Sequence, residues 1–264
     1  MKRKTASTET RKRRSKFGEV VHRLTKSVPA MIALSFILLL ILSAVFAPYI
    51  APYDYAKQNL VEKFTFPNAQ HLLGTDNFGR DILSRLIYGG RISLLVSMMA
   101  VGISVFFALI LGATAGYFGG IYDTIVMRVL DVFMAIPGTL LTIVVSVALG
   151  TSLVDTAVAI AVGSVPALAR QLRASTLLIR GEEYIEAAKS FGSSHFRIIR
   201  KHVLPNTLAP VIVQISLRLG ESITAIAGMS FIGLGIQPPT PEWGNMLSSG
   251  QQYIRSFWPL ITFP

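Results

Sequence analysis

Long apolar runs separated by short polar segments dominate the pattern of this chain. Residues 28–49, VPAMIALSFILLLILSAVFAPY, contain no charged side chain. About 20 apolar residues are enough for a helix to cross the hydrocarbon core of a bilayer. The run is longer than the about 7–15 apolar residues typical of a secretory signal peptide, and more apolar runs follow it. The sequence therefore predicts a retained transmembrane helix here.

Further apolar runs predict four more membrane-spanning helices, at residues 92–117, 124–149, 154–168 and 208–236. The final run begins at residue 257 and ends at Pro264 after about 8 residues, which are too few to cross a bilayer. Composition agrees, because 15% of the 264 residues are charged, against about 25% in soluble proteins. We expect an all-α, polytopic membrane domain over residues 28–264, with about five full transmembrane helices and a truncated sixth.

Glycine and proline residues predict how these helices pack and bend. Glycine recurs every fourth residue near the end of the second helix, at Gly112, Gly116 and Gly120. Small residues at this spacing let neighbouring helices approach closely. Proline removes an intrahelical hydrogen bond, so we expect Pro137 to kink the third helix and Pro166 to interrupt the fourth.

The segment 50–90, between the first two spans, has turn residues and charges that nearly cancel. Within it, residues 81–88 place aliphatic side chains at helical spacing, with Asp81 and Arg85 on the opposite side. Such a helix is expected to lie in the membrane interface rather than to span the membrane. A lid packed on the helix ends is an equally good interpretation.

Positive charge is concentrated in a basic tail, residues 1–27. Ten Lys and Arg residues minus two Glu residues give this tail +8 of the net charge of +11. Basic residues before a first span are typical of a cytoplasmic N-terminus. Binding of nucleic acid is disfavoured, because Phe17 is the single aromatic residue of the tail. We therefore interpret the tail as cytoplasmic.

A second basic excess lies in the segment 170–206. Four crossings from a cytoplasmic N-terminus also place this segment in the cytoplasm, so charge and crossing number agree. The same topology places segments 50–90 and 237–256 outside.

Residues 182–206, EEYIEAAKSFGSSHFRIIRKHVLPN, form the longest polar passage after the N-terminal third. The pattern predicts a helix over 182–191 with Ile185 and Phe191 on one side. Gly192 suits the left-handed conformation that ends helices, and a serine after it can cap a second helix, which we expect Pro205 to stop. A solvated helix–turn–helix connector and a contact site for another protein explain this pattern equally well.

The spacing of this segment resembles the cytoplasmic EAA loop of ABC-importer permeases. The matching residues are Glu186-Ala187-Ala188, Gly192 and Leu204-Pro205. His202 departs from the pattern, which more often has isoleucine there. The segment 73–94, LGTDNFGRDILSRLIYGGRISL, is similar to the corresponding stretch of the C-type dipeptide, oligopeptide and nickel permeases.

The resemblance implies an ABC-importer permease fold in the cytoplasmic (inner) membrane of a bacterium. It implies a second related permease, two ATPase subunits and an external substrate-binding protein as partners, besides the lipid bilayer. The short helix at Glu186–Gly192 would sit in a cleft of one ATPase, and closure of the ATPases would switch the pathway from inward- to outward-facing. Di- or oligopeptides are the implied substrates, with nickel or another small solute as the alternative.

Signatures of catalysis are missing from the sequence, which favours a transport subunit over an enzyme. The dipeptide Gly-Lys does not occur, so ATP and Mg²⁺ are expected on partner subunits and no cofactor is expected in this chain. The zinc-protease pattern HExxH, the nucleophile elbow GxSxG and cysteine are also absent, and we expect no metal site. A self-sufficient secondary transporter would require inverted repeats, which the sequence does not display.

Two charged pairs lie inside predicted spans, Arg128 with Asp131 and Arg218 with Glu221. Each pair is spaced i,i+3 and so shares a helix face. A charge at mid-bilayer costs at least about 2.5–3.5 kcal/mol, so we expect these side chains to face the bundle or a membrane surface. Lining of the transport pathway and self-neutralising helix packing are both open interpretations.

Overall fold

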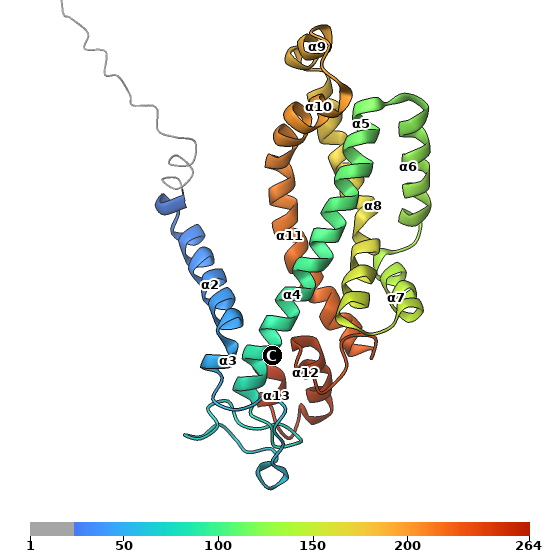
Figure 1. The fold of residues 1–264 in the computed structure, drawn as a ribbon. Helices are drawn as coiled ribbons and strands as arrows, with labels where there is room; N and C mark the ends of the chain where they lie inside the picture. The colour runs from blue at the N-terminus through green and yellow to red at the C-terminus, as the bar shows by residue number, and fades with distance from the viewer. Residues whose placement is uncertain (1–23) are drawn as a thin grey trace, which may run out of the picture.

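A computed structural model describes residues 24–264 of the chain, without the side chains at 208 and 209. The predicted basic tail lies outside the described residues up to residue 23. The described part is helical, with one isolated β-bridge between Thr75 and Asp81, as the all-α prediction requires. Its helices are α2 (Val28–Val45), α3 (Ala47–Ile50), α4 (Ile82–Ala108), α5 (Thr114–Phe118), α6 (Gly120–Met134), α7 (Gly138–Leu149), α8 (Leu153–Arg180), α9 (Glu183–Ser190), α10 (His195–Ile198), α11 (Leu204–Phe231), α12 (Trp243–Gly250) and α13 (Pro259–Thr262) (Figure 1).

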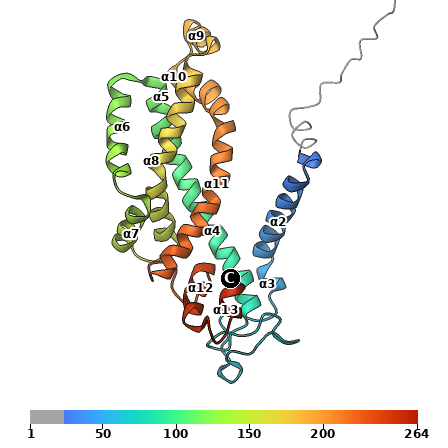
Figure 2. The same cartoon turned by 180° about the vertical axis from the view of Figure 1, so that it is seen from behind.

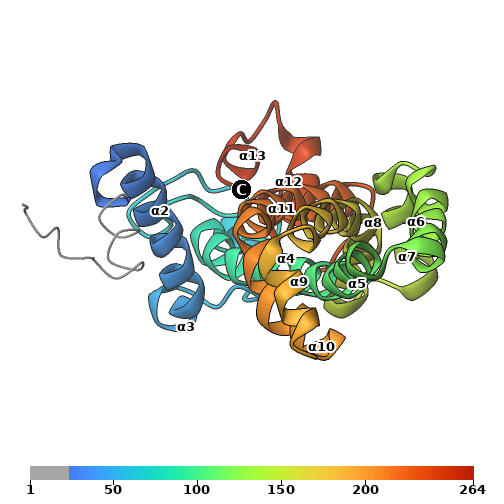
Figure 3. The same ribbon diagram turned by 90° about the horizontal axis from the view of Figure 1, so that it is seen from above.

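The long helices form an elongated bundle with two different ends (Figure 1). The α9 end carries α9 and α10. The α12 end carries α12, α13 and the loops of residues 51–81, and the opposite view shows the same order (Figure 2). Buried side chains of α4, α8 and α11 form the core between the ends. Viewed along the bundle, α2 stands to one side and α6 and α7 to the other (Figure 3).

Four helical segments in the described residues are long and apolar enough to cross a membrane, and the bent pair α6–α7 makes a fifth. The predicted number of about five spans is therefore confirmed when the bent pair counts as one. The helices of this pair meet at an angle of 85°. The kink predicted at Pro137 is confirmed and is a full break between two helices.

The predicted interfacial helix at residues 81–88 is wrong, because these residues open a much longer helix. Helix continues from Ile82 to Phe118, passing through a π-helical turn at Leu109–Ala113. Arg85, whose charge suggested an interface, is buried and lies 3.6 Å from the Asp76 carboxylate. A buried partner thus lets a charged residue start a spanning helix. The alternative of a lid formed by residues 81–88 is wrong for the same reason, because residues 82–88 belong to this long helix.

Neither Pro166 nor Pro205 interrupts a helix, contrary to expectation. Pro166 lies inside the continuous helix α8, Leu153–Arg180. Pro205 lies in the first turn of α11, where the missing N–H has no intrahelical partner to lose. Both ends of the predicted loop 170–206 are therefore helical, because α8 ends at Arg180 and α11 begins at Leu204. The connecting loop consists of residues 181–203 and contains α9 and α10.

The glycine spacing in the second predicted helix does bring helices together, at two of its three positions. A Cβ added to Gly112 would lie 2.3 Å from the Ala169 carbonyl oxygen of α8, and one added to Gly116 would lie 2.8 Å from that of Arg173. Close packing of this helix on α8 is therefore confirmed. Gly120 has open space around it, and the prediction is wrong there.

Candidate coupling loop and central cavity

The connecting loop has a helix–glycine–helix form, as predicted. Gly192 has a φ of +74°, a left-handed backbone that glycine adopts without strain. A Cβ at this position would meet nothing within 4 Å, so backbone conformation rather than space requires glycine. The Ser193 N–H donates to the Ala188 carbonyl at 3.0 Å and closes the end of α9. Ser194 begins α10 without a side-chain cap, so capping by this hydroxyl is not observed.

The loop rests on the end of α5 through an apolar contact. Ile185, Ile198 and Val203 are fully buried and form one cluster with Tyr117. Phe191, expected beside Ile185, is instead 89% exposed. The reason is that α9 ends at Ser190, and the following turn carries this side chain away from the bundle.

One polar contact supports this docking and joins residues far apart in the sequence. The Tyr117 hydroxyl lies 2.9 Å from His195 Nδ1, and the Lys189 ammonium lies over the Tyr117 ring, 5.6 Å from its centre. Sequence reasoning missed Tyr117, because it reads as the last residue of an apolar span. No local pattern links it to the loop.

The residues of the EAA resemblance lie mainly on the outer side of this docked loop. Glu186, Ala187 and Pro205 are exposed, and Ala188 and Leu204 are half-buried. Among the described residues Glu186 has no ion-pair partner. The loop therefore has a packed face toward α5 and an open face.

The predicted pair Arg128–Asp131 is a minor contact. Its closest atoms, Nη1 and Oδ2, are 3.9 Å apart, and the Arg128 side chain is 81% exposed. Asp131 accepts a closer hydrogen bond from Arg170 of α8, and Arg173 of α8 donates two to Asp123. Asp131 therefore has two arginine partners, and its closer one, together with the Arg173–Asp123 pair, ties α6 to α8.

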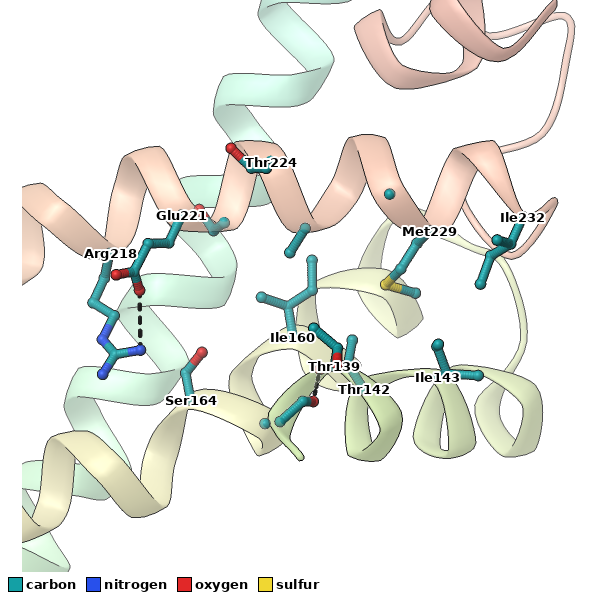
Figure 4. A pocket seen from close by; sticks show the side chains of 15 residues that line it. Thr139, Thr142, Ile143, Ile160, Ser164, Arg218, Glu221, Thr224, Met229 and Ile232 are labelled. Atoms are coloured by element: carbon teal, nitrogen blue, oxygen red, sulfur yellow. Dashed lines mark hydrogen bonds and ion pairs between the residues drawn. The ribbon is translucent and has the colours of Figure 1, made fainter. Parts of the chain in front are cut away.

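The second predicted pair, Arg218–Glu221, is present. Arg218 Nη1 donates to Glu221 Oε2 at 3.0 Å. Both side chains line a cavity of about 500 Å³ between α7, α8 and α11, shown in Figure 4. Cavities of roughly 300–1,000 Å³ hold small-molecule ligands in proteins.

A buried carboxylate at the α12 end, that of Glu242, escaped the sequence reasoning. Glu242 is 1% exposed and begins α12. Its oxygens accept four hydrogen bonds of 2.8–3.0 Å that join α4, α11 and α12. The donors are the hydroxyls of Ser93 and Ser230 and the backbone N–H groups of Gly244 and Asn245.

Family comparisons agree with this architecture. Residues 105–263 match the family "Binding-protein-dependent transport system inner membrane component". Residues 15–69 match "N-terminal TM domain of oligopeptide transport permease C". Together the two matches cover most of the chain.

Individual relatives point the same way. The dipeptide transport system permease protein DppC of Alkalihalophilus pseudofirmus is 42% identical over 95% of this chain and 82% of its own length. The glutathione transport system permease protein GsiD of Escherichia coli O157:H7 is 41% identical over 90% of this chain and 79% of its own length.

A solved structure is similar in fold. It is the MetNI methionine ABC transporter in inward-facing conformations, with a TM-score of 0.54 and 22% identity, over 68% of this chain and 86% of that one. At this identity the likeness concerns the fold alone. By its sequence matches, this multi-pass chain belongs to the binding-protein-dependent transport system inner membrane components, as a C-type permease of an ABC importer.

Proposed function

We propose that this chain forms half of the translocation pathway of an ATP-driven peptide importer in the cytoplasmic (inner) membrane of a bacterium. A second related permease forms the other half, one of two ATPase subunits binds the α9 end of this chain, and an external binding protein delivers the cargo. Relatives named for dipeptide and glutathione transport support di- or oligopeptides over nickel as cargo. ATP and Mg²⁺ belong to the ATPase subunits.

The docking of the connecting loop carries this proposal. Its outer face displays Glu186 and two exposed aromatic side chains, Phe191 and Phe196, which are 89% and 73% exposed. Its inner face is buried against Tyr117 of α5. A push on the outer face is therefore delivered to α5 and, through Gly112 and Gly116, to α8. This arrangement suits a loop that an ATPase cleft holds.

The arrangement of the ends supports the proposed topology. Two basic stretches, the N-terminal tail and the connecting loop, belong on the cytoplasmic side by the positive-inside rule. The α9 end therefore faces the cytoplasm, and the α12 end faces the binding protein. Glu186-Ala187-Ala188, Gly192 and Leu204-Pro205 are the coupling residues of this proposal.

Co-purification with the ATPase subunits, followed by measurement of ATP-dependent peptide uptake, tests the proposal. Gly192→Ala strains the left-handed turn and moves the open face, so we expect at least about tenfold lower uptake and weaker ATPase association. Gly181→Ala is the matched control, because its Cβ meets only the Leu178 carbonyl oxygen, at 3.8 Å. Normal association and uptake in both Gly192→Ala and Glu186→Ala would overturn the coupling role.

A further inference from the structure

The cavity between α7, α8 and α11 has two chemically different ends (Figure 4). Arg218, Glu221 and Ser164 lie at one end. Ile143, Met229 and Ile232 lie at the other. The cavity therefore suits a ligand with a charged head and an apolar side chain.

The break at Pro137 accounts for the opening. The 85° bend swings α7 away from the line of α6. A Cβ at Gly163 of α8 would lie 2.5 Å from the Thr142 hydroxyl oxygen, so α7 lies close against α8 there. Gly228 lines the α11 side, and a Cβ there would meet nothing within 4 Å. The cavity therefore has room beside α11 at this position.

The charged pair lies near the middle of its span. The apolar part of α11 runs over Pro210–Phe231, 22 residues. At about 1.5 Å per residue, Arg218 lies about 12 Å and Glu221 about 16 Å along a span of about 33 Å. Charges at this depth are costly and mark functional sites more often than packing contacts.

The bonding of this pair differs from that of the charges on α6. Asp123 and Asp131 are held by arginines of another helix. Arg218 and Glu221, by contrast, bond only to each other among the described residues, and the Glu221 side chain is 64% exposed. A guanidinium has five N–H donors, so most of them remain available, as do acceptor positions on the carboxylate.

We propose that this cavity binds the two charged termini of a short peptide, a refinement that rests on the proposed peptide import. The terminal carboxylate pairs with Arg218 and the terminal ammonium with Glu221, replacing the bond between these side chains. The apolar lining next to the pair, which includes Ile160 and Ala225, holds a side chain of the peptide. The cavity is neutral when empty and remains neutral with a zwitterion bound, so entry of the peptide leaves no uncompensated charge in the membrane.

The spacing of the pair limits the length of the peptide. Each residue of an extended chain adds about 3.3–3.6 Å, whereas Arg218 and Glu221 are one helical turn apart. Both termini of a di- or tripeptide can reach them together, and those of an extended pentapeptide cannot. The site therefore selects short peptides with free termini.

Photo-crosslinking tests the site with alanyl-photoleucine, a dipeptide that carries a diazirine in its apolar side chain. The probe is added to the complex of permeases and ATPases without the binding protein, whose own selectivity is thereby removed. We expect mass spectrometry to find the label on the cavity lining next to the charged pair, on α8 near Ile160 or on α11 near Ala225, because Met229 lies about 12 Å along α11 from Glu221. C-amidated, N-acetylated and pentapeptide forms of the probe should label on the order of tenfold to hundredfold less.

Variants that remove one charge at a time link each terminus to its partner. Arg218→Gln should abolish the preference for the free over the amidated probe, and Glu221→Gln the preference for the free over the acetylated probe. Arg128→Gln removes a charge of the same i,i+3 spacing outside the cavity and should retain both preferences. Because the probe forms are also compared on the unaltered protein, the result does not depend on the folding of any variant.

Equal labelling of the unaltered protein by all probe forms, labelling away from the cavity, or an unchanged preference in Arg218→Gln would overturn the proposal. Uptake of the free dipeptide by the complete importer in proteoliposomes separates the two levels of inference. If the dipeptide is taken up but labelling does not depend on the termini, the proposed site is refuted and the proposed function as a peptide importer still stands. No ATP-dependent uptake of di- or oligopeptides overturns the proposed function and the site with it.

Discussion

The two ends of the bundle are held by different kinds of contact. At the α12 end, buried charges and hydroxyls converge: Glu242 accepts four hydrogen bonds, and Asp76 accepts the Arg80 guanidinium at 2.6 Å. At the α9 end, the loop rests on Tyr117 through aliphatic side chains and one side-chain hydrogen bond. Directional polar networks favour one geometry, whereas apolar contact is non-directional.

This difference matches the two roles in the proposed transport cycle. A loop that receives a push from an ATPase must transmit motion, and an apolar seat tolerates small rotations. An end that receives the binding protein benefits from a fixed surface. Trp243 adds to that fixation, because its indole N–H donates to the Leu86 carbonyl at 2.9 Å and its ring lies against Gly90 of α4. Substitutions at the two ends should therefore affect different observables.

Glu242→Ala should have the largest effect on stability. It leaves two hydroxyls and two backbone N–H groups without their acceptor in a buried position, which costs about 3–5 kcal/mol. Thermal unfolding of the detergent-solubilised permease should show a correspondingly lower midpoint. Glu242→Gln preserves shape and some acceptors, so it should lose less. A midpoint no lower than that of the exposed Glu186→Ala would contradict a fixed α12 end.

Asp76→Ala should destabilise the same end by less, about 2–4 kcal/mol. Its carboxylate accepts from the backbone N–H groups of Phe78 and Arg80 and from the Arg80 side chain. Arg85 keeps a second contact, to the Tyr55 carbonyl at 3.2 Å, which limits the loss. Asp54→Ala, an exposed turn carboxylate, is the control for the same unfolding measurement. Equal unfolding midpoints for the two variants would mean that the contacts of Asp76 with Arg80 and Arg85 do not stabilise the α12 end.

Ile185→Ala should act on the opposite end and on a different observable. A buried isoleucine truncated to alanine costs about 2–5 kcal/mol of local packing, here in the seat of the loop. We expect several-fold lower peptide uptake per ATP hydrolysed, with a smaller change in the unfolding midpoint than for Glu242→Ala. The control is Leu178→Ala, whose side chain is exposed. Normal coupling of uptake to ATP hydrolysis in Ile185→Ala would show that the apolar contact between the loop and Tyr117 does not transmit motion.

The sequence predicted the helices and the glycine turn well because these features are local. Apolar length indicates a span, and Gly192 is required by its own backbone angle. Errors arose where a distant partner changed the meaning of a residue. The charge of Arg85 indicates an interface, but in the fold Arg85 is buried beside Asp76. The i,i+3 spacing pairs Asp131 with Arg128, although Arg170, 39 residues away, lies closer.

The candidate sites divide in the same way. The pair Arg218–Glu221 was predictable from its i,i+3 spacing, but the cavity beside it was not, because three helices form it. The predictions made from proline residues were unreliable for a related reason. Pro137 breaks a helix and Pro166 does not, and packing of the neighbouring helices, rather than proline itself, decides between these outcomes.

Tyr117→Phe should produce the smallest effect and separates the polar from the apolar part of the loop docking. It removes only the hydrogen bond to His195, worth about 0.5–1.5 kcal/mol, so coupled uptake should fall by no more than about tenfold. Tyr122→Phe is the matched control, since its hydroxyl bonds Thr114 within the same region. His195→Ala should lower uptake by a similar factor, and the double variant should add little, because both changes remove one bond. Additive losses would instead mean that the two side chains act separately and that aliphatic packing alone seats the loop on α5.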